Sequence, residues 1–340
     1  MKKFINAPGS YVDEMLGGIL EAHPVLLRQA ANDIRCLVRA QSGNAKVRLV
    51  TGGGSGHLPL FLGYVGEGML DGCAVGGVFQ SPSAEQWYQT AKAYDLSKGV
   101  LFLYGNYTGD IMNYEMAKEM LEMDGIRVGE VRGRDDVASA PKGEEHKRRG
   151  VAGIFFMYKC AGAMAEEGGD FDEVKRIAEK VGNNVRTIGV ALSPCTIPEA
   201  GSPGFSIGDN DMEIGMGIHG EPGIRRGGLR PADNVVDEIM NPILADLPIT
   251  SGDEVAVLMN GLGGTPLDEL YILYKRVHHN LKAAGAKVFH VYAGEYATAM
   301  EMTGFSLSIL KLDGELKRLL AAPAYTPFFE QRQLPAESRT

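Results

Sequence analysis

The sequence has few cysteines and none of the patterns that bind a metal or cross-link a secreted fold. Its 4 cysteines are far apart and no two of them form a CxxC pair: Cys36, Cys73, Cys160 and Cys195. The N-terminal segment also lacks the apolar run of a secretory signal. Disulfide frameworks and signals of that kind are typical of proteins in oxidising compartments. We therefore expect a reduced, cytoplasmic protein.

Long hydrophobic runs and an excess of positive charge are also missing. The longest apolar stretch, 151–165, spans about 15 residues and contains Lys159, whereas a membrane helix needs about 20. There are 34 Lys and Arg against 43 Asp and Glu, which gives a formal net charge of −9. A general nucleic-acid binder needs a concentrated positive face. We expect neither a membrane nor a nucleic acid as partner, and instead a small molecule or another protein.

Glycine, by contrast, is abundant. The chain has 45 glycines among 340 residues, roughly twice the usual share. No collagen-like period and no flexible linker accounts for this excess. The glycines therefore belong in tight turns and in loops that a ligand or another backbone approaches closely.

The periodicity predicts an α/β chain of two domains. Short β-rich runs at 47–51 and 99–104 each lead into a glycine-containing loop. Helical spacing follows both runs, weakly over 59–68 and clearly over 111–124. A length of 340 residues suits two domains, since one domain usually has about 100–200 residues.

We place the domain boundary near residue 185, where the pattern changes. Residues 1–185 hold both glycine-containing loops, a buried helix over 150–169 and a charged, exposed loop over 135–149. Residues 186–321 begin with a strand and a loop-rich stretch and then return to alternating strands and helices. The tail, 322–340, is expected to pack back on the first domain or on a dimer partner.

The first glycine-rich loop reads GGGSGH over 52–57. It lacks both the GK[ST] ending of a P-loop and the GxGxxG register, so it does not support nucleotide binding. Its amides can form an anion nest or let a ligand approach the backbone. A tight strand-to-helix turn capped by Ser55 explains the spacing equally well. His57 favours a functional site, because open α/β sheets bind ligands at this edge.

The second loop reads NYTGD over 106–110 and precedes a predicted helix. Asp110 suits a plain N-cap, which is the commonest role for Asp at such a position. The alternative role of Asp110, as one member of an acid–base pair, depends on His57. Two strands that end side by side bring both ionisable groups to one sheet edge, as an acid–base pair requires.

The third cluster reads GIHGEPG over 217–223 and carries His219. Asp209, Asp211 and Glu213 precede it at alternate positions, which suits an extended segment with its acids on one face. His219 has no Cys and no second His at ligand spacing, so a metal site is not expected there. The sequence also lacks the HExxH and GxSxG motifs.

Taken together and in this order, the three motifs resemble the substrate-binding K subunit of dihydroxyacetone kinases. The likeness covers nearly the whole chain and extends to RRGVAG at 148–153, GVALSPCTIP at 189–198, DNDMEIGMGIHGEPG at 209–223, NGLGGTPLDELY at 260–271 and MTGFSLSILK at 302–311. The resemblance implies a homodimer of two α/β domains with mixed sheets. It also implies a small ketose, dihydroxyacetone, as a covalently held substrate.

The same resemblance implies a role for each candidate site residue. His219 would add a ring nitrogen to the substrate carbonyl and form a hemiaminal, which selects ketones over polyols. Asp110 would accept the proton of the terminal hydroxyl, while His57 would hydrogen-bond the substrate and stabilise charge. Gly54 would lie against the substrate, where a Cβ would intrude, and Ser55 belongs to the same substrate-binding loop.

The family also implies where the phosphoryl donor is held. It lies on an L subunit that carries ADP or ATP with Mg²⁺ and that the phosphotransferase system recharges in many bacteria. This chain shows no nucleotide-binding loop and ends at Thr340 without an L domain. Because phosphoryl transfer needs a positioned, charge-neutralised donor, we expect a separate L subunit as partner and no cofactor or metal on this chain.

Two positions depart from the family pattern. Leu58 stands where the family has Glu, and Gly105 stands where it has Lys. The loss of one charge of each sign suggests a reshaped pocket with room at Gly105. A larger ketose such as erythrulose is therefore an alternative substrate, and a non-catalytic, ketose-binding transcriptional co-activator is an alternative function. A co-activator has no use for a general base, so the presence of Asp110 favours the kinase subunit.

Overall fold

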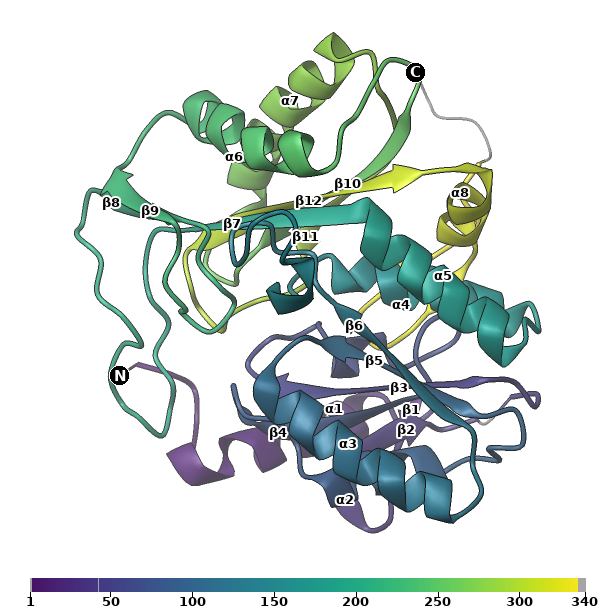
Figure 1. The fold of residues 1–340 in the computed structure, drawn as a ribbon. Coiled ribbons are helices and arrows are strands. Elements are labelled where there is room, and N and C mark those ends of the chain that lie inside the picture. The colour runs from purple at the N-terminus through teal and green to yellow at the C-terminus, as the bar shows by residue number, and fades with distance from the viewer. Residues whose placement is uncertain (1, 42, 336–340) are drawn as a thin grey trace.

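The structure is a computed structural model that describes residues 2–41 and 43–335. Each half of the chain forms one six-stranded sheet, and helices pack against both sheets (Figure 1). Both sheets contain parallel and antiparallel pairs. The predicted α/β fold with two α/β parts and mixed sheets is therefore confirmed.

The first sheet has the order β1-β2-β4-β3-β5-β6. Its strands β4, β3, β5 and β6 run parallel, while β1 and β2 form an antiparallel edge. The carboxyl ends of β3 and β5 therefore lie at the same edge, where loops of parallel sheets bind ligands. The strands are β1 Leu27–Ala30, β2 Asp33–Arg39, β3 Arg48–Ser55, β4 Gly72–Val78, β5 Val100–Gly105 and β6 Val128–Gly133.

Two helices of the first half, α2 and α5, begin at residues whose side chains cap a helix N-terminus. Ser83 with Gln86, and Asp170 with Glu173, form capping boxes that satisfy free amides at the starts of α2 and α5. The helices and 3₁₀ turns are η1 Pro8–Ser10, α1 Tyr11–Ala22, η2 Leu62–Tyr64, α2 Ala84–Lys92, α3 Thr108–Met123, η3 Glu145–Lys147, α4 Ile154–Glu166 and α5 Phe171–Asn184.

The second sheet has the order β11-β10-β12-β7-β8-β9, and only β10 and β11 pair in parallel. Helices α6 and α7 pack together on one side of it (Figure 1). The strands are β7 Val185–Ala191, β8 Asp211–Ile214, β9 Arg225–Gly228, β10 Glu254–Gly261, β11 Lys287–Glu295 and β12 Gly304–Leu312. The remaining elements are α6 Ala232–Asp246, α7 Leu267–Ala283, α8 Gly314–Ala321, β13 Ala324–Tyr325 and β14 Glu330–Gln331.

Helix α4 lies at the centre of the molecule, between the two sheets (Figure 1). Every residue from Ile154 to Ala165 is buried, as the apolar run predicts. The one charged side chain in that run, Lys159, donates to the carbonyl of Leu319 at 3.1 Å. The hydrophobic core continues around α4 from Leu101 in the first sheet to Leu258 in the second. The two halves therefore share a continuous core.

The predicted helix over 59–68 is wrong. The segment forms turns and the short 3₁₀ helix η2 instead. Phe61 has a φ of 67°, which an α-helix does not permit. The chain thus stays irregular after the GGGSGH loop.

The predicted exposed loop over 135–149 is also wrong in part, because three of its charged residues are buried. Asp135 accepts the backbone N–H groups of Val151 and Gly153 at 2.9 and 2.8 Å. Arg148 forms two hydrogen bonds with Asp246, at 3.0 and 2.6 Å. Asp136 is paired with the neighbouring Arg149. Each buried charge thus keeps hydrogen-bond or ion-pair partners inside the protein, as buried charges require, and the sequence pattern does not reveal these partners.

The described part of the tail contacts both halves of the chain. The Thr326 hydroxyl donates to the carbonyl of Gly63 at 2.7 Å, and the Tyr292 hydroxyl donates to Gln331 at 2.7 Å. Residues 336–340 lie outside the described residues, and contact with a dimer partner stays a prediction. No helix in the described part of the chain is long and apolar enough to cross a membrane.

Candidate active site

Three loops meet at the carboxyl edge of the first sheet. His57 follows β3, Asp110 lies in the first turn of α3 after β5, and His219 lies between β8 and β9. The rings of His57 and His219 are 4.8 Å apart and nearly perpendicular, at 77°. His219 is near enough to Asp110 that a positive charge on its ring would lower the pKa of the Asp110 carboxyl, against the larger effect of burial. The fold thus gathers the three predicted residues from both halves of the chain.

His57 is buried as a neutral ring with a fixed tautomer. Its Nδ1 lies 2.7 Å from the carbonyl oxygen of Thr298. A carbonyl can only accept, so Nδ1 carries the proton and Nε2 keeps a free lone pair. Burial, with a smaller effect from His219, lowers the pKa of His57 to about 3. Within the described residues, Nε2 has no hydrogen-bond partner.

Phe79 holds both histidine rings in place. It stacks on His57 at 4.7 Å and meets the ring of His219 edge-on at 5.2 Å. Its φ of 57° lies in the left-handed region, which an aromatic residue adopts only when the surroundings enforce it. No motif in the sequence drew attention to Phe79.

Gly54 and Ser55 shape this corner through their own contacts. A Cβ on Gly54 would lie 2.8 Å from Cα of Phe79 and 2.7 Å from the amide nitrogen of Gln80. Glycine is therefore required for the backbones to approach each other. Ser55 donates its hydroxyl to the carbonyl of Gly76 at 2.9 Å. It does not cap a helix, because 3₁₀ helix η2 begins only at Leu62.

Asp110 is a buried carboxyl group rather than an N-cap. The N-cap of α3 is Tyr107, which leaves Asp110 inside the first turn. Burial raises the pKa of Asp110 to about 6, although a hydrogen bond with Ser81 and the charge of His219 oppose this rise. Its Oδ1 has no partner within the described residues. A carboxylate with a pKa near 6 is ionised at neutral pH and can accept a proton.

Glu221 orients His219, and the sequence analysis did not assign it this role. Its carboxylate lies 2.8 Å from Nδ1 of His219 and accepts the His219 backbone N–H at 2.6 Å. Burial would raise the pKa of Glu221, but hydrogen bonds from His219 and the charge of Arg149 lower it to about 2. Nδ1 therefore donates to a carboxylate, and Nε2 is the nitrogen left free to react. The His-Gly-Glu spacing was the signal that could have revealed this pair.

Tyr107 fills the space that the sequence predicted to be open beside Gly105. Its ring meets His219 edge-on at 4.8 Å, and its hydroxyl is buried without a partner among the described residues. A Cβ on Gly105 would lie 2.9 Å from Cε2 of Tyr107. The expected room at Gly105 is therefore absent, because the missing side chain lets the Tyr107 ring pack close to His219.

Gly105→Ala should disturb His219 through this contact. The added methyl group displaces the Tyr107 ring, and overpacking of this kind typically costs about 1–3 kcal/mol. We expect about a tenfold loss in the affinity for a ligand that reacts with His219, measured by intact mass spectrometry over a ligand concentration series. Gly227→Ala is the matched control, because no atom lies within 4 Å of its Cβ. Equal affinity in the two variants would contradict the role of Tyr107.

Comparisons with known proteins extend over all three loops. The sequence model of the Dak1 domain matches residues 17–328. PTS-dependent dihydroxyacetone kinase 2, dihydroxyacetone-binding subunit DhaK, of Listeria innocua is 46% identical over 97% of this chain and 99% of the relative. The D-erythrulose kinase of Mycolicibacterium smegmatis is 41% identical over 97% of this chain and 57% of the relative. The crystal structure of the dihydroxyacetone kinase of C. freundii matches with a TM-score of 0.90 and 30% identity, over 100% of this chain and 62% of the other.

Proposed function

The chain belongs to the Dak1 domain family, and on this premise we propose that it is the substrate-binding subunit of a dihydroxyacetone kinase. It holds the ketose as a hemiaminal on His219 and presents a terminal hydroxyl for phosphorylation. The observation that carries this proposal is the His219–Glu221 pair, which leaves one imidazole nitrogen free beside His57 and Tyr107.

The geometry of the His219–Glu221 pair supports covalent attachment of the ketose. Nε2 of His219 attacks the carbonyl carbon of the ketose: a C–N bond forms, the π bond of the carbonyl breaks, and the oxygen takes up a proton from solvent water to become a hydroxyl. The imidazole gains positive charge when Nε2 forms this bond. The carboxylate of Glu221, at 2.8 Å from Nδ1, balances that charge or accepts the Nδ1 proton. A polyol offers no carbonyl carbon, so it cannot be held in this way.

Asp110 and His57 then act on the terminal hydroxyl. Asp110, ionised at neutral pH, accepts its proton as the oxygen attacks the phosphorus of the donor. His57 is neutral with a lone pair on Nε2, so it accepts a hydrogen bond and orients the substrate. Of the two roles predicted for His57, we therefore keep the hydrogen bond to the substrate and drop the stabilisation of charge. Gly54 and Ser55 form the substrate-binding wall beside them.

The phosphoryl donor comes from a partner protein in this proposal. The partner is the L subunit, which holds ADP or ATP with Mg²⁺, and the phosphotransferase system recharges it. Its nucleotide and metal neutralise the charge of the transferred group, while this chain supplies the positioned acceptor. We also propose a homodimer in the cytoplasm, as the family resemblance implies.

A panel of short ketoses tests the proposal. The purified protein is incubated with dihydroxyacetone, L-erythrulose, D-erythrulose and glycerol, and intact mass spectrometry detects a gain of one substrate mass. We expect an adduct with dihydroxyacetone and none with glycerol. If none of the ketoses forms an adduct, the proposed covalent attachment is wrong, because Nε2 of His219 would then be unreactive.

Erythrulose remains a second candidate substrate because of the similarity to D-erythrulose kinase. An adduct at lower concentration with an erythrulose than with dihydroxyacetone would favour it. A turnover assay with an L subunit and its phosphoryl donor distinguishes the kinase subunit from the co-activator alternative. A chain that forms the adduct but never yields phosphorylated ketose would be a binding protein, and the buried Asp110 would then have no catalytic use.

A further inference from the structure

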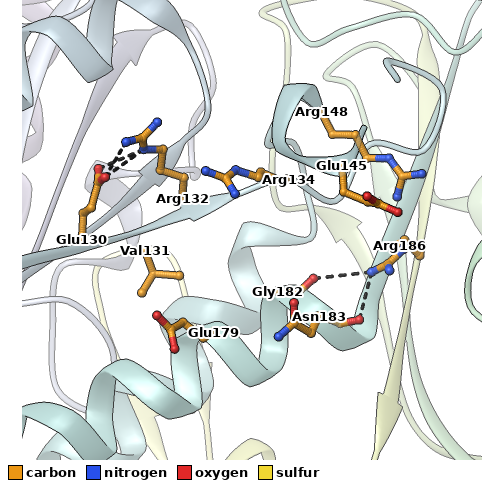
Figure 2. Close-up of a pocket in the computed structure, with 10 residues that line it drawn as sticks. All are labelled: Glu130, Val131, Arg132, Arg134, Glu145, Arg148, Glu179, Gly182, Asn183 and Arg186. Atoms are coloured by element: carbon orange, nitrogen blue, oxygen red, sulfur yellow. Dashed lines mark hydrogen bonds and ion pairs between the residues drawn. The ribbon is translucent and has the colours of Figure 1, made fainter. Parts of the chain in front are cut away.

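A charged pocket lies at the junction of the two halves, beside the second loop, where Asn106 donates to the backbone carbonyl of Arg148 at 2.8 Å. It has a volume of about 360 Å³ and is formed by β6, the segment around η3, the end of α5 and the start of β7 (Figure 2). It shares no lining residue with the candidate active site. The lining residues are Glu130, Val131, Arg132, Arg134, Glu145, Arg148, Glu179, Gly182, Asn183 and Arg186.

Three of the four arginines in this pocket already have an acidic partner. Arg132 donates from Nε to both oxygens of Glu130 at 3.0 Å, and Arg148 binds Asp246 through two hydrogen bonds. Arg186 pairs with the same Asp246. These contacts fix the walls of the pocket, and because Arg148 and Arg186 share one carboxylate, one positive charge of this group stays uncompensated.

Arg186 also removes an obstacle to an anion. The carbonyl oxygens at the end of α5 carry partial negative charge, which repels anions. Arg186 donates from Nη1 to the carbonyls of Gly182 and Asn183, at 3.4 and 3.1 Å (Figure 2). The negative end of the helix is therefore covered where it faces the pocket.

Arg134 is the exception among the four arginines. Within residues 2–41 and 43–335 it forms no ion pair or hydrogen bond, and its Nε is buried without an acceptor. Its side chain extends between Arg132 and the segment with Glu145 and Arg148 (Figure 2). Burial and the like charge of Arg132 lower the pKa of Arg134. A partly desolvated charge without a counter-ion is costly unless a ligand supplies one.

We propose that this pocket binds a small anion, with a phosphate or carboxylate group on the guanidinium of Arg134. A planar guanidinium donates two parallel hydrogen bonds to either group. Glu130, Glu145 and Glu179 line the same pocket, so they repel a long polyanion and accept hydrogen bonds from hydroxyl groups. The ligand class is therefore a compact organic anion, such as a short-chain phosphate ester or a small carboxylate that carries hydroxyls.

The test uses inorganic phosphate, glycerol 3-phosphate and succinate as probes, with ionic strength held constant by NaCl. Saturable binding is measured by isothermal titration calorimetry on the full chain. A rise in Tm with probe concentration is the second measurement, because a ligand that binds the folded state stabilises it more as the ratio of its concentration to Kd grows. We expect at least one probe to bind saturably. Binding of the two phosphates alone assigns a phosphate ligand, and binding of succinate alone assigns a carboxylate. Saturation by none of the three probes would overturn the proposal.

Probe binding by single-residue variants tests whether the anion binds at Arg134. Arg134→Ala should weaken binding at least about tenfold, and Glu179→Gln should strengthen it a few-fold by removing negative charge. Arg127→Ala is the matched control, because Arg127 is exposed and paired with Asp172 outside the pocket. His219→Ala should leave binding unchanged, since the ketose site is separate. Equal binding by the Arg134→Ala and Arg127→Ala variants would overturn the site.

If Arg134→Ala fails to fold, Arg134→Lys keeps the charge and loses the planar fork. It should still weaken binding several-fold, because Lys donates as a point charge. Unchanged binding in a folded Arg134→Lys variant, together with unchanged binding in Glu179→Gln, would also overturn the proposal.

Discussion

His219→Ala should abolish the covalent ketose adduct completely. The reaction needs a ring nitrogen with a free lone pair, and no other described histidine has the same carboxylate-oriented geometry beside His57 and Tyr107. Intact mass spectrometry after incubation with dihydroxyacetone should show the unmodified mass only, at every ketose concentration. His278→Ala is the control, since His278 lies on α7 beside Tyr274 and away from the site. Its adduct should match that of the unaltered protein.

An adduct that survives in His219→Ala would show that another nucleophile holds the ketose. Buried lysines are the first alternative to examine, because a lysine would form a Schiff base and lose water. The two products differ in mass by one water molecule. The same measurement therefore distinguishes a hemiaminal from a Schiff base without any further variant.

Asp110→Asn should keep the adduct and stop phosphorylation. An amide cannot accept the hydroxyl proton, and general-base help is typically worth about 10²–10⁴ in rate. The measurement is phosphorylated ketose formed per adduct with a saturating, donor-loaded L subunit. In the unaltered protein the rate should fall as the pH drops below about 6, because the pKa of Asp110 is raised to about 6 by burial. Full turnover in Asp110→Asn would remove Asp110 from the role of base.

The stability of the same variant provides an independent control. The pKa of Asp110 in the folded protein is above the value of 3.8 for an unperturbed Asp, so the folded protein binds this proton more tightly than the unfolded chain. The stability from that proton is present below pH 3.8 and is lost as the pH rises through about 6. Asp110→Asn should therefore raise Tm at pH 7 to 8 and change it little at low pH. A destabilised variant at neutral pH would indicate that Asp110 has structural contacts instead.

Elements with a strong local pattern were predictable from the sequence. The unbroken apolar run after Gly150 predicted the buried helix α4, and the spacing after Asp110 predicted α3. The weak pattern after Pro59 was misleading, because Phe61 adopts a positive φ that no periodicity encodes. The antiparallel strands β1 and β2 were not predicted either. Their short sequences mix polar and apolar residues without a clean alternation.

The candidate site divides in the same way. Motif order identified His57, Asp110 and His219, because each lies in a glycine-containing motif. Phe79 and Tyr107 were missed, since their importance lies in contacts with residues distant in the chain. The apparent room at Gly105 was misread for the same reason. A sequence shows a missing side chain, but it does not show which neighbour occupies the space.

The hydrogen bond between His57 and Thr298 links residues 241 positions apart. Two backbone hydrogen bonds also join these segments, from the Thr298 amide to the His57 carbonyl at 3.2 Å and from the Met300 amide to the Gly56 carbonyl at 2.8 Å. Contacts of such long range form late, after the loop entropy between them has been overcome. The His57 tautomer that leaves Nε2 free is therefore fixed only when both halves are in contact. Neither half alone contains His57, Asp110 and His219, so ketose binding by the proposed mechanism requires the complete fold.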